Sequence, residues 1–335
     1  MEYTTLGPTG TEVSRLCFGT WRFGKEAADG SFETTREEAH ELLDAAHDNG
    51  INFIDTANTY GNGRSEQWIG EWLESHDREE FVLASKVYWT VESPVSENLS
   101  RKTIRAEIEG TLDRLNTDYV DLYYIHRWDE ATPIEETLST LSDLVREGKV
   151  NYVGASTMAG WKLMKALKTS DVEDFERFQV AQPLFHAAYR DDVMDYLEVC
   201  QDQDLAVCPY SPLAGGFLTG KYERVETDDG YEVEGPAGSR LDTDEMFEDW
   251  YVSERAWHVL DAVREVADEA DATPAQVALR WLMDHDEFTT VPIVGARTRA
   301  QLEENAGAVD VSLSSAQHDR ITDARYAEGD RRWGH

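Results

Sequence analysis

Short apolar runs alternate with longer segments in which apolar side chains recur every three or four residues, and this alternation continues almost to the end of the chain. A continuous apolar run is typical of a strand buried on both faces, as in a parallel sheet. The longer segments have the period of amphipathic helices. Strands are predicted at residues 15–20, 52–56, 81–87, 120–126, 151–155, 178–182, 206–210 and 290–294. Helices are predicted at residues 35–48, 65–74, 101–115, 134–147, 191–201 and 254–269.

The number and order of these repeats predict the fold. Eight strands in one continuous chain favour an α/β fold that closes on itself, a (β/α)8 TIM barrel, with residues 1–335 as a single domain. The alternative, an open dinucleotide-binding sheet, needs a GxGxxG turn directly after the first strand, whereas residues 19–24 read GTWRFG. Residues 61–63 read GNG, but they follow the second strand and lack a third glycine. The closed barrel is therefore preferred.

Three additions to the minimal barrel are predicted. The first residues form a small β-hairpin with its turn near residues 7–10, where glycine and proline occur together. After the seventh strand, residues 215–249 are rich in glycine and aspartate and form a connection too long to be idle, which makes them a candidate lid. An extra C-terminal helix begins at Ser314, and the chain ends in a polar tail at residues 329–335.

The charge of the chain limits its possible partners and surroundings. There are 67 Asp and Glu against 31 Lys and Arg, a formal net charge of −36, which excludes a nucleic-acid backbone as partner. Carboxylates at this density repel one another in dilute buffer, whereas in molar salt the Debye length falls to about 3 Å. A halophilic cytoplasm is therefore predicted, with an acidic protein of an ordinary cytoplasm as the alternative.

No export signal or membrane-spanning apolar run is recognisable, so a cytoplasmic protein without membrane association is expected. The three cysteines, Cys17, Cys200 and Cys208, lack CxxC spacing, and no disulfide or metal site is predicted. Cys17 and Cys208 lie in apolar runs, where thiols act as small buried hydrophobes. A hydrophobic content of 41% is ample for a large core.

Residues suited to proton transfer stand at or just beyond the ends of predicted strands: Asp55, Tyr60, Lys86 and His126. In a (β/α)8 barrel the carboxyl ends of the strands meet at one mouth, so these residues should converge. A phenol has an ordinary pKa of about 10 and needs a nearby cation to favour its phenolate. Lys86 is the candidate cation and Asp55 its support. Each residue alone also fits a structural role, such as a helix cap or a core ion pair, but the four together favour chemistry.

Residues 50–61, GINFIDTANTYG, resemble the Asp-to-Tyr signature of the aldo-keto reductase family. Further segments similar to that family are ASKV, DLYYIH, GAS and AQP, which begin at residues 84, 121, 154 and 181. The segment YSPLAGGFLTGK at residues 210–221 resembles the branch that also contains bacterial general-stress reductases and potassium-channel β subunits. The resemblance extends over nearly the whole chain.

This resemblance implies an NADPH-dependent oxidoreductase that reduces aldehydes or ketones to alcohols. Tyr60 would be the general acid, with its pKa lowered by Lys86. Asp55 would support Lys86, and His126 would polarise the carbonyl. The assignment agrees with the chemistry, because hydride transfer develops negative charge on oxygen, where a proton donor and a hydrogen-bond donor must meet. Channel β subunits carry Asn where this chain has His126, which favours an enzyme over a mainly regulatory subunit.

The resemblance also implies a site for NADPH, with NADH less favoured. Arg297 stands at the start of a predicted helix after the last strand, where helix N–H groups and a guanidinium suit a ribose phosphate. Ser156 and Gln182 would hold the nicotinamide carboxamide, and Tyr210 would stack on its ring. The full set of cofactor-binding residues carried over from the family is Gly19, Thr20, Trp21, Asp55, Ser156, Gln182, Tyr210, Ser211, Pro212, Leu213, Gly215, Lys221, Gly295, Arg297, Gln301, Glu304 and Asn305.

Trp21, Trp89 and Trp128 follow strands one, three and four and are expected to line a pocket for a small-molecule carbonyl substrate; core packing is the competing explanation. Three other functions stay open. These are oxidation of an alcohol or sugar, a lyase with Lys86 as Schiff-base nucleophile, and an NADP(H)-binding redox sensor for a partner protein. The natural substrate, the physiological direction and the oligomeric state do not follow from the sequence.

Overall fold

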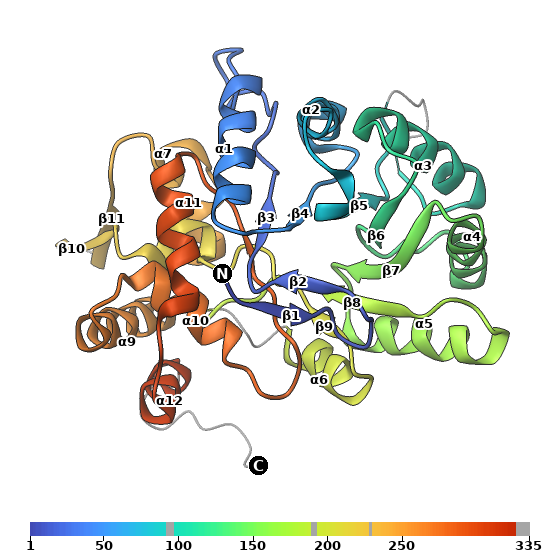
Figure 1. Cartoon of the computed structure of the whole chain (residues 1–335). Coiled ribbons are helices and arrows are strands. Elements are labelled where there is room, and N and C mark those ends of the chain that lie inside the picture. Colours follow the sequence, from blue (N-terminus) through green and yellow to red (C-terminus); the bar gives the residue numbers. More distant parts are fainter. Residues whose placement is uncertain (92–96, 189–192, 228–229, 326–335) are drawn as a thin grey trace.

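The computed structural model describes residues 1–91, 97–188, 193–227 and 230–325. Eight parallel strands form one curved sheet, and helices cover its outer face (Figure 1). Neighbouring strands follow chain order, except that the last strand lies beside the first. Their bounds are Cys17–Gly19 (β3), Phe53–Asp55 (β4), Val82–Val87 (β5), Val120–Ile125 (β6), Val150–Ser156 (β7), Phe178–Gln182 (β8), Ala206–Val207 (β9) and Ile293–Val294 (β12).

The sheet closes into a barrel through the segment that leads into β12. Thr290 bridges to Val207 of β9, and the Val291 N–H donates to the Val207 carbonyl at 2.9 Å. Three residues beyond Thr290, β12 pairs with β3, where Ile293 lies opposite Cys17. The (β/α)8 barrel predicted from the alternation is confirmed. Seven of the predicted strands contain the observed one, and the predicted strand at residues 151–155 lies within β7.

The two faces of the sheet carry different side chains. Phe53, Ala84 and Leu122 belong to a buried cluster inside the barrel. The alternate residues, such as Ile54 and Leu83, belong to the larger cluster between the sheet and the helices. Because successive side chains of a strand point to opposite faces, a residue two positions beyond an inside residue also points into the barrel.

The outer helices are amphipathic, and several have side-chain caps. α1 begins after Thr35 and α10 after Thr273, and both caps form capping boxes with the residue three positions on. The bounds are Arg36–Asp48 (α1), Arg64–Leu73 (α2), Arg101–Leu115 (α3), Ile134–Arg146 (α4), Gly160–Glu173 (α5), Met194–Asp202 (α6), Glu254–Ala270 (α9), Pro274–Met283 (α10) and Arg299–Ala306 (α11). The six predicted helices correspond to α1–α4, α6 and α9; positions 191–192 of the fifth lie outside the described residues.

The predicted N-terminal hairpin covers the amino-terminal end of the barrel. It consists of Tyr3–Thr5 (β1) and Glu12–Ser14 (β2), and Leu6 and Val13 join the cluster inside the barrel. Gly7 has φ +54°, and a Cβ there would lie 2.7 Å from the backbone nitrogen of Ala206. A glycine is therefore required where the hairpin turn approaches β9.

The candidate lid at residues 215–249 has more regular structure than the sequence indicated. Positions 228–229 lie outside the described residues. The described part contains an exposed hairpin, Glu223–Thr227 (β10) with Gly230–Glu234 (β11), and a short helix, Arg240–Thr243 (α7). A second short helix, Phe247–Tyr251 (α8), begins within it. Phe247 and Tyr251 are buried, and Phe217 of the same segment packs against the ring of Trp257 in α9 with centroids 4.9 Å apart. These aromatic contacts hold the segment against the barrel, and periodicity did not reveal them.

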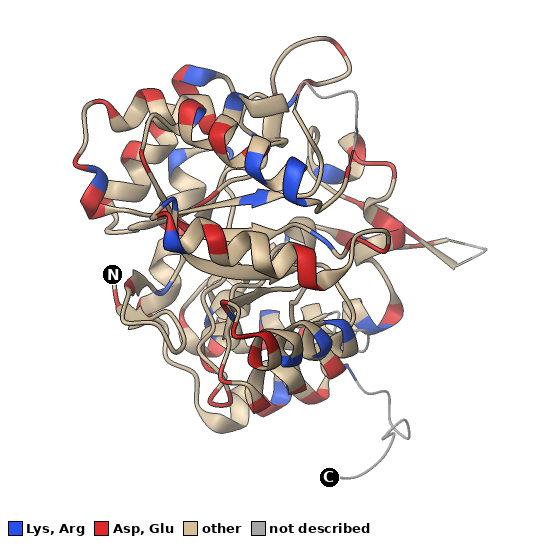
Figure 2. Cartoon of the chain, turned by 90° about the vertical axis from the view of Figure 1, so that its right-hand side faces the viewer, with Lys and Arg blue, Asp and Glu red and all other residues tan. Residues whose placement is uncertain are grey.

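The extra C-terminal helix is confirmed as Ser315–Asp323 (α12), with Ser314 as its cap. Arg320 of α12 donates to Glu269 of α9 at 2.6 Å. The polar tail at residues 329–335 lies outside the described residues. Figure 2 shows acidic positions spread over the outer helices and loops, with basic positions among them. In the part of the chain that the structure describes, no helix has the length and apolar character needed to cross a membrane.

Candidate active site

Polar side chains form a layer inside the barrel at the carboxyl ends of its strands. Asp55 and Lys86 come two positions after the inside residues Phe53 and Ala84, and so continue the inward rows of β4 and β5. Gln182 occupies the equivalent last position of β8. The apolar interior therefore ends, at one mouth, in groups that can hold charge or transfer a proton.

Lys86 is the centre of this layer. Its Nζ donates to Asp55 Oδ1 at 2.5 Å, to the Thr56 carbonyl at 2.7 Å and to the Tyr60 hydroxyl at 3.2 Å. An ammonium has three N–H donors, so all of them have acceptors. The side chain of Lys86 is 0% exposed and that of Asp55 is 4% exposed, which shields the pair from solvent.

A tight turn brings Tyr60 over Lys86. Tyr60 opens a 3-10 turn in which Gly61 and Asn62 have φ values of 57° and 58°. A Cβ at Gly61 would lie 2.3 Å from the carbonyl oxygen of Phe23, so the turn requires glycine at this position. The local sequence thus determines how Tyr60 is presented after β4.

His126 follows β6 directly and lies beside Tyr60. The two rings meet edge to face with centroids 5.9 Å apart, and Trp89 packs on His126 at 4.9 Å. Burial, together with the positive charges of Lys86 and Arg127, holds the pKa of His126 well below its usual value. The imidazole is therefore neutral at pH 7 with one N–H to donate, and its Nδ1 has no hydrogen-bond partner among the described residues.

The ionisation of Tyr60 depends on the balance between burial and the charge of Lys86. Burial opposes charge on Lys86, but the attraction of Asp55 and Tyr60 outweighs it and raises the pKa of the ammonium. Burial raises the pKa of Tyr60, and Lys86 offsets only part of that rise. Lys86 thus acts in the predicted direction, but desolvation of the phenolate is the larger effect, so the pKa of Tyr60 stays above its ordinary value. Tyr60 consequently keeps its proton at neutral pH.

Ser156 and Gln182, predicted to hold a nicotinamide carboxamide, lie in the same buried layer. Gln182 Nε2 donates to Asp55 Oδ2 at 2.9 Å, and Ser156 Oγ donates to the Gln182 carbonyl at 2.8 Å. Thr20 Oγ1 donates to the Asp55 carbonyl at 3.0 Å. Both carboxylate oxygens of Asp55 are therefore engaged, one by Lys86 and one by Gln182, a link that the motifs did not indicate.

Arg297, predicted to bind a ribose phosphate, stands before α11. Its backbone N–H donates to Gln301 Oε1 at 2.9 Å, and its guanidinium donates to the Gly238 carbonyl at 2.6 Å. The second contact joins the start of α11 to the 215–249 segment. Of the other residues predicted here, Glu304 is exposed and Asn305 is buried.

Two further cations, Arg22 and Arg240, lie close to Lys221 and Arg297. Burial and the charges of Arg240 and Arg297 lower the pKa of Arg22 to about 10. Burial, followed by the charges of Arg297, Arg22 and Arg240, lowers the pKa of Lys221. Glu33 is the carboxylate partner of Arg22. Sequence reasoning missed Arg22 and Arg240, because neither lies in a recognised motif; the scarcity of basic residues was the available signal.

The loop after β9 connects the cations to the mouth of the barrel. Ser211 and Gly215 have positive φ values of 51° and 65°, and a Cβ at Gly215 would lie 2.8 Å from the ring of Tyr251. The Tyr251 hydroxyl donates to Ser211 Oγ at 3.3 Å. Tyr251, which ends α8 just beyond the candidate lid, thus packs on the loop that was predicted to line a pyrophosphate. The remaining predicted residues are placed as follows: Tyr210 and Leu213 are half-buried, Pro212 is buried, and Gly19 and Gly295 are neighbours at the ends of β3 and β12.

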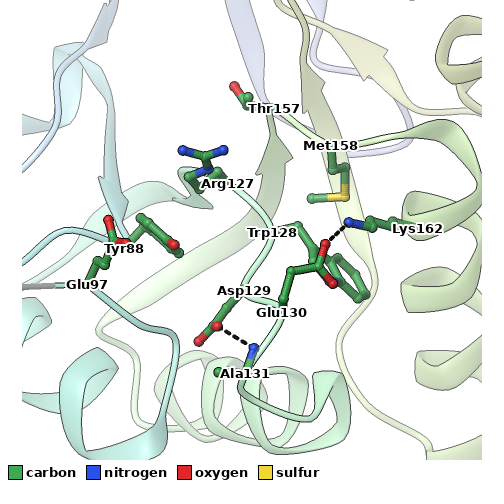
Figure 3. Close-up of a pocket in the computed structure, with 10 residues that line it drawn as sticks. All are labelled: Tyr88, Glu97, Arg127, Trp128, Asp129, Glu130, Ala131, Thr157, Met158 and Lys162. Carbon is green, nitrogen blue, oxygen red and sulfur yellow. Dashed lines mark hydrogen bonds and ion pairs between the residues drawn. The ribbon is translucent and has the colours of Figure 1, made fainter.

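A cavity of about 560 Å³ lies beside this mouth (Figure 3). Its lining comes from the loops that follow β5, β6 and β7, together with the first turn of α5. The lining residues are Tyr88, Glu97, Arg127, Trp128, Asp129, Glu130, Ala131, Thr157, Met158 and Lys162. This volume is within the range of small-molecule sites.

The three tryptophans predicted to line a substrate pocket occupy different places. Trp128 lines the cavity, whereas Trp89 packs on the ring of His126. Trp21 is 40% exposed and lies between cations, with Lys25 Nζ 3.8 Å and the Arg240 guanidinium 5.1 Å from its ring. Trp21 is therefore on the side of the cationic group rather than in the cavity lining.

A closed parallel barrel whose mouth carries a buried Lys–Asp pair, a tyrosine and a neutral histidine defines an α/β-barrel enzyme. A family model described as "Aldo/keto reductase family" matches residues 15–325. The chain belongs to the aldo/keto reductase family, which places it among oxidoreductases that use NAD(P)H.

Individual relatives match over almost their whole length. The chain is 37% identical to an uncharacterized oxidoreductase, YrpG, of Bacillus subtilis, over 93% of this chain and 92% of that protein. It is 33% identical to norsolorinic acid reductase stcV of Emericella nidulans, over 96% of this chain and 81% of that protein. It is 32% identical to a probable voltage-gated potassium channel subunit beta of Arabidopsis thaliana, over 93% of this chain and 92% of that protein.

Proposed function

We propose that the protein reduces aldehydes or ketones to alcohols with NADPH, with Tyr60 as general acid. The observation that carries this proposal is the 3.2 Å contact between Lys86 Nζ and the Tyr60 hydroxyl, because the same ammonium is paired with Asp55 at 2.5 Å. A phenol beside a buried, paired ammonium can release its proton to a basic oxygen and leave a stabilised phenolate. Family membership supports carbonyl chemistry at this mouth.

The residues of the mouth would act on the carbonyl oxygen. NADPH, when bound, supplies the hydride for the carbonyl carbon. As negative charge develops on the oxygen, Tyr60 gives it a proton and neutral His126 donates a hydrogen bond to it. The raised pKa of Tyr60 keeps the proton on the hydroxyl until the oxygen becomes basic enough to take it. The positive charge of Lys86 then stabilises the negative charge left on the Tyr60 oxygen.

The cationic group fits the phosphates of NADPH better than those of NADH. In a chain with 31 basic residues against 67 acidic ones, Arg22, Lys221, Arg240 and Arg297 lie together against their own repulsion. A pyrophosphate and an additional 2′-phosphate would neutralise that group. Arg297, at the start of α11, is proposed to contact the 2′-phosphate, and Lys221 the pyrophosphate.

The test is the loss of NADPH absorbance with an activated aromatic aldehyde, such as 4-nitrobenzaldehyde, in molar KCl. The parent should turn over, and Tyr60→Phe should lose a factor of about 10²–10⁴ in kcat, the usual contribution of a general acid. NADPH affinity, read from quenching of tryptophan fluorescence, should stay nearly unchanged in Tyr60→Phe. Full activity in that variant would refute the role of Tyr60.

A redox-sensing subunit is the second candidate, because one relative is named a probable potassium channel subunit beta. Tight NADPH binding without turnover of any carbonyl would favour that function. The reverse reaction, oxidation of an alcohol or sugar, uses the same residues. Formation of NADPH from NADP⁺ and a panel of alcohols tests it.

The net charge supports a further proposal about the surroundings of the protein. At −36, the folded chain repels itself in dilute buffer, and molar salt screens that repulsion. We therefore propose that the enzyme works in the cytoplasm of a halophile. Loss of the folded state on removal of KCl would support this proposal.

A further inference from the structure

Arg127 is a charged residue at the candidate active site that the proposed reaction does not use. It follows His126 directly, is exposed, and lines the 560 Å³ cavity. Among the described residues it forms no hydrogen bond or ion pair, and its recorded contact is with the ring of Tyr88, 5.7 Å from the guanidinium carbon. In Figure 3 no dashed line reaches it. Carboxylates outnumber basic residues 67 to 31, so a guanidinium without one is unexpected.

Most other charges of the cavity already have partners. Lys162 forms an ion pair with Glu130, which also lines the cavity (Figure 3). Asp129 accepts the N–H groups of Leu99 at 2.9 Å and Ala131 at 2.8 Å. These contacts neutralise a cation and satisfy a carboxylate within the lining, so they leave little attraction for a ligand.

Glu97 is the remaining charge, and it lies by Tyr88. Its negative charge, like burial, raises the pKa of Tyr88, whereas Arg127 acts in the opposite direction. The two charged side chains therefore flank the same ring. An anion entering the cavity would be repelled by Glu97 and attracted by Arg127, which determines where its charged end binds.

The field of Arg127 extends to the reacting groups. After burial and Lys86, its charge contributes to the low pKa of His126. It also opposes the burial that raises the pKa of Tyr210. Arg127 thus lines the cavity, follows His126 directly in the chain, and is near enough to His126 and Tyr210 for its charge to act on both. A ligand in the cavity could therefore bind Arg127 with one end and reach towards His126 with the other.

We propose that the substrate is a carbonyl compound with an anionic group, a carboxylate or a phosphate, and that Arg127 anchors this group by a bidentate contact. A guanidinium presents two parallel N–H donors that match either oxyanion. This inference rests on the proposed function, since it names the substrate class of the same site. Arg127 becomes the residue that selects among carbonyl compounds.

The experiment compares 4-formylbenzoate with its methyl ester, which has similar size but no charge; the intrinsic difference in carbonyl reactivity cancels when the ratio is compared between variants. Wild type should prefer the carboxylate, and Arg127→Met should reduce the ratio of the two kcat/KM values by about 10- to 100-fold, as expected for loss of a charge-assisted hydrogen bond. The loss should fall on KM rather than kcat, because the anchor is remote from the reacting atoms. Arg127→Lys should restore part of the ratio.

Lys165→Met is the matched control. Lys165 is an exposed cation on α5 whose Nζ is 5.9 Å from the ring of Trp128, and it is not in the cavity lining. Its loss removes the same charge and should leave the ratio unchanged. A second comparison, of glyceraldehyde 3-phosphate with glyceraldehyde, distinguishes a phosphate from a carboxylate. If Arg127→Met lowers the kcat/KM ratio more for this second substrate pair, the anchored group is a phosphate; if it lowers the ratio more for the first pair, the group is a carboxylate.

Outcomes against this inference are distinct from failure of the proposed function. If the methyl ester is reduced but the ratio is the same in wild type and Arg127→Met, the reductase stands and the anion site is refuted. If Lys165→Met changes the ratio equally, general charge rather than Arg127 is responsible, which also refutes it. If no aldehyde turns over, calorimetric binding of 4-formylbenzoate decides: equal affinity for wild type and Arg127→Met refutes the site, and a 10-fold or greater loss, about the value of one such contact, supports it.

Discussion

Replacement of Asp55 by Asn tests the buried ion pair on which the candidate active site depends. The change keeps the size of the side chain and removes its negative charge. Lys86 is 0% exposed and would be left as a buried ammonium with the Thr56 carbonyl and the Tyr60 hydroxyl as its acceptors. An amide in place of the carboxylate also alters the contact that Asp55 Oδ2 accepts from Gln182 at 2.9 Å.

The magnitude follows from the burial of the pair. Removal of one partner of a buried ion pair costs about 3–5 kcal/mol in the free energy of unfolding, because the other charge stays buried without compensation. A chain of 335 residues has an unfolding entropy of about 0.7 kcal/mol per degree, so Asp55→Asn should lower Tm by about 4–7 °C. The double variant Asp55→Asn/Lys86→Met should regain part of the loss, since neither charge remains.

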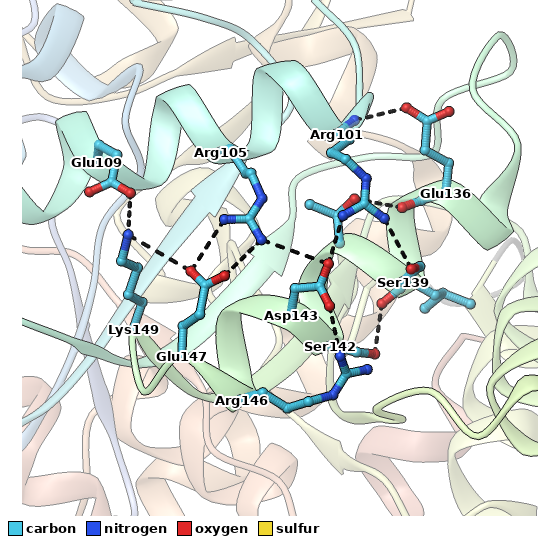
Figure 4. Close-up of polar contacts among 12 residues, drawn as sticks. Arg101, Arg105, Glu109, Glu136, Ser139, Ser142, Asp143, Arg146, Glu147 and Lys149 are labelled. Atoms are coloured by element: carbon cyan, nitrogen blue, oxygen red, sulfur yellow. Dashed lines mark hydrogen bonds and ion pairs between the residues drawn. The ribbon is translucent and has the colours of Figure 1, made fainter.

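The assay is urea unfolding followed by tryptophan fluorescence at constant KCl, with Tm from circular dichroism. Glu147→Gln is the matched control, because it also changes a carboxylate into an amide. Glu147 accepts from Arg105 at 2.7 Å on the outside of α3 and α4 (Figure 4), and the two side chains are 38% and 37% exposed. Solvent screens this pair, so its loss should change stability little.

Two outcomes would refute this reasoning. If Asp55→Asn lowers Tm no more than Glu147→Gln does, the Lys86–Asp55 pair is not effectively buried in solution. If the double variant is less stable than both single variants, the cost does not come from an uncompensated charge. An unchanged m value is needed for the comparison, because it shows that the same surface is exposed on unfolding.

Three further predictions follow from the site and the charge. Arg297→Ala should weaken NADPH binding by about 10- to 100-fold and NADH binding much less, because only NADPH carries the 2′-phosphate; equal losses in fluorescence titrations would contradict this. His126 takes up a proton more readily unfolded than folded, so stability is full above its ordinary pKa of about 6.5 and declines below it. Between pH 7 and 5 the free energy of unfolding of the parent, measured with urea, should therefore fall by up to about 2 kcal/mol more than that of His126→Asn. Equal falls in the two proteins would disprove this role of His126. The Tm should rise steeply between low and molar KCl, and a flat curve would argue for an ordinary acidic protein.

The eight-strand barrel was predictable because its signal is local and repeated. Apolar runs separated by amphipathic segments favour a parallel sheet covered on one side by helices, and a sheet of eight such strands can close into a barrel. The position of Asp55 at the end of a strand, with Tyr60 one short loop further on, was also visible in the chain. Together they predicted that Asp55, Tyr60 and Lys86 would converge, and the structure places them within hydrogen-bond distance through Lys86.

The sequence by itself therefore determined the fold class, the strand ends that carry polar groups, and the candidate residues for proton transfer. Tertiary structure decided the net ionisation of Tyr60, because desolvation depends on all the atoms that surround the phenol. It also decided that Arg22 and Arg240 join Lys221 and Arg297, and that Arg127 lines the cavity without a carboxylate partner among the described residues. Such contacts join residues far apart in the chain, and no local period encodes them.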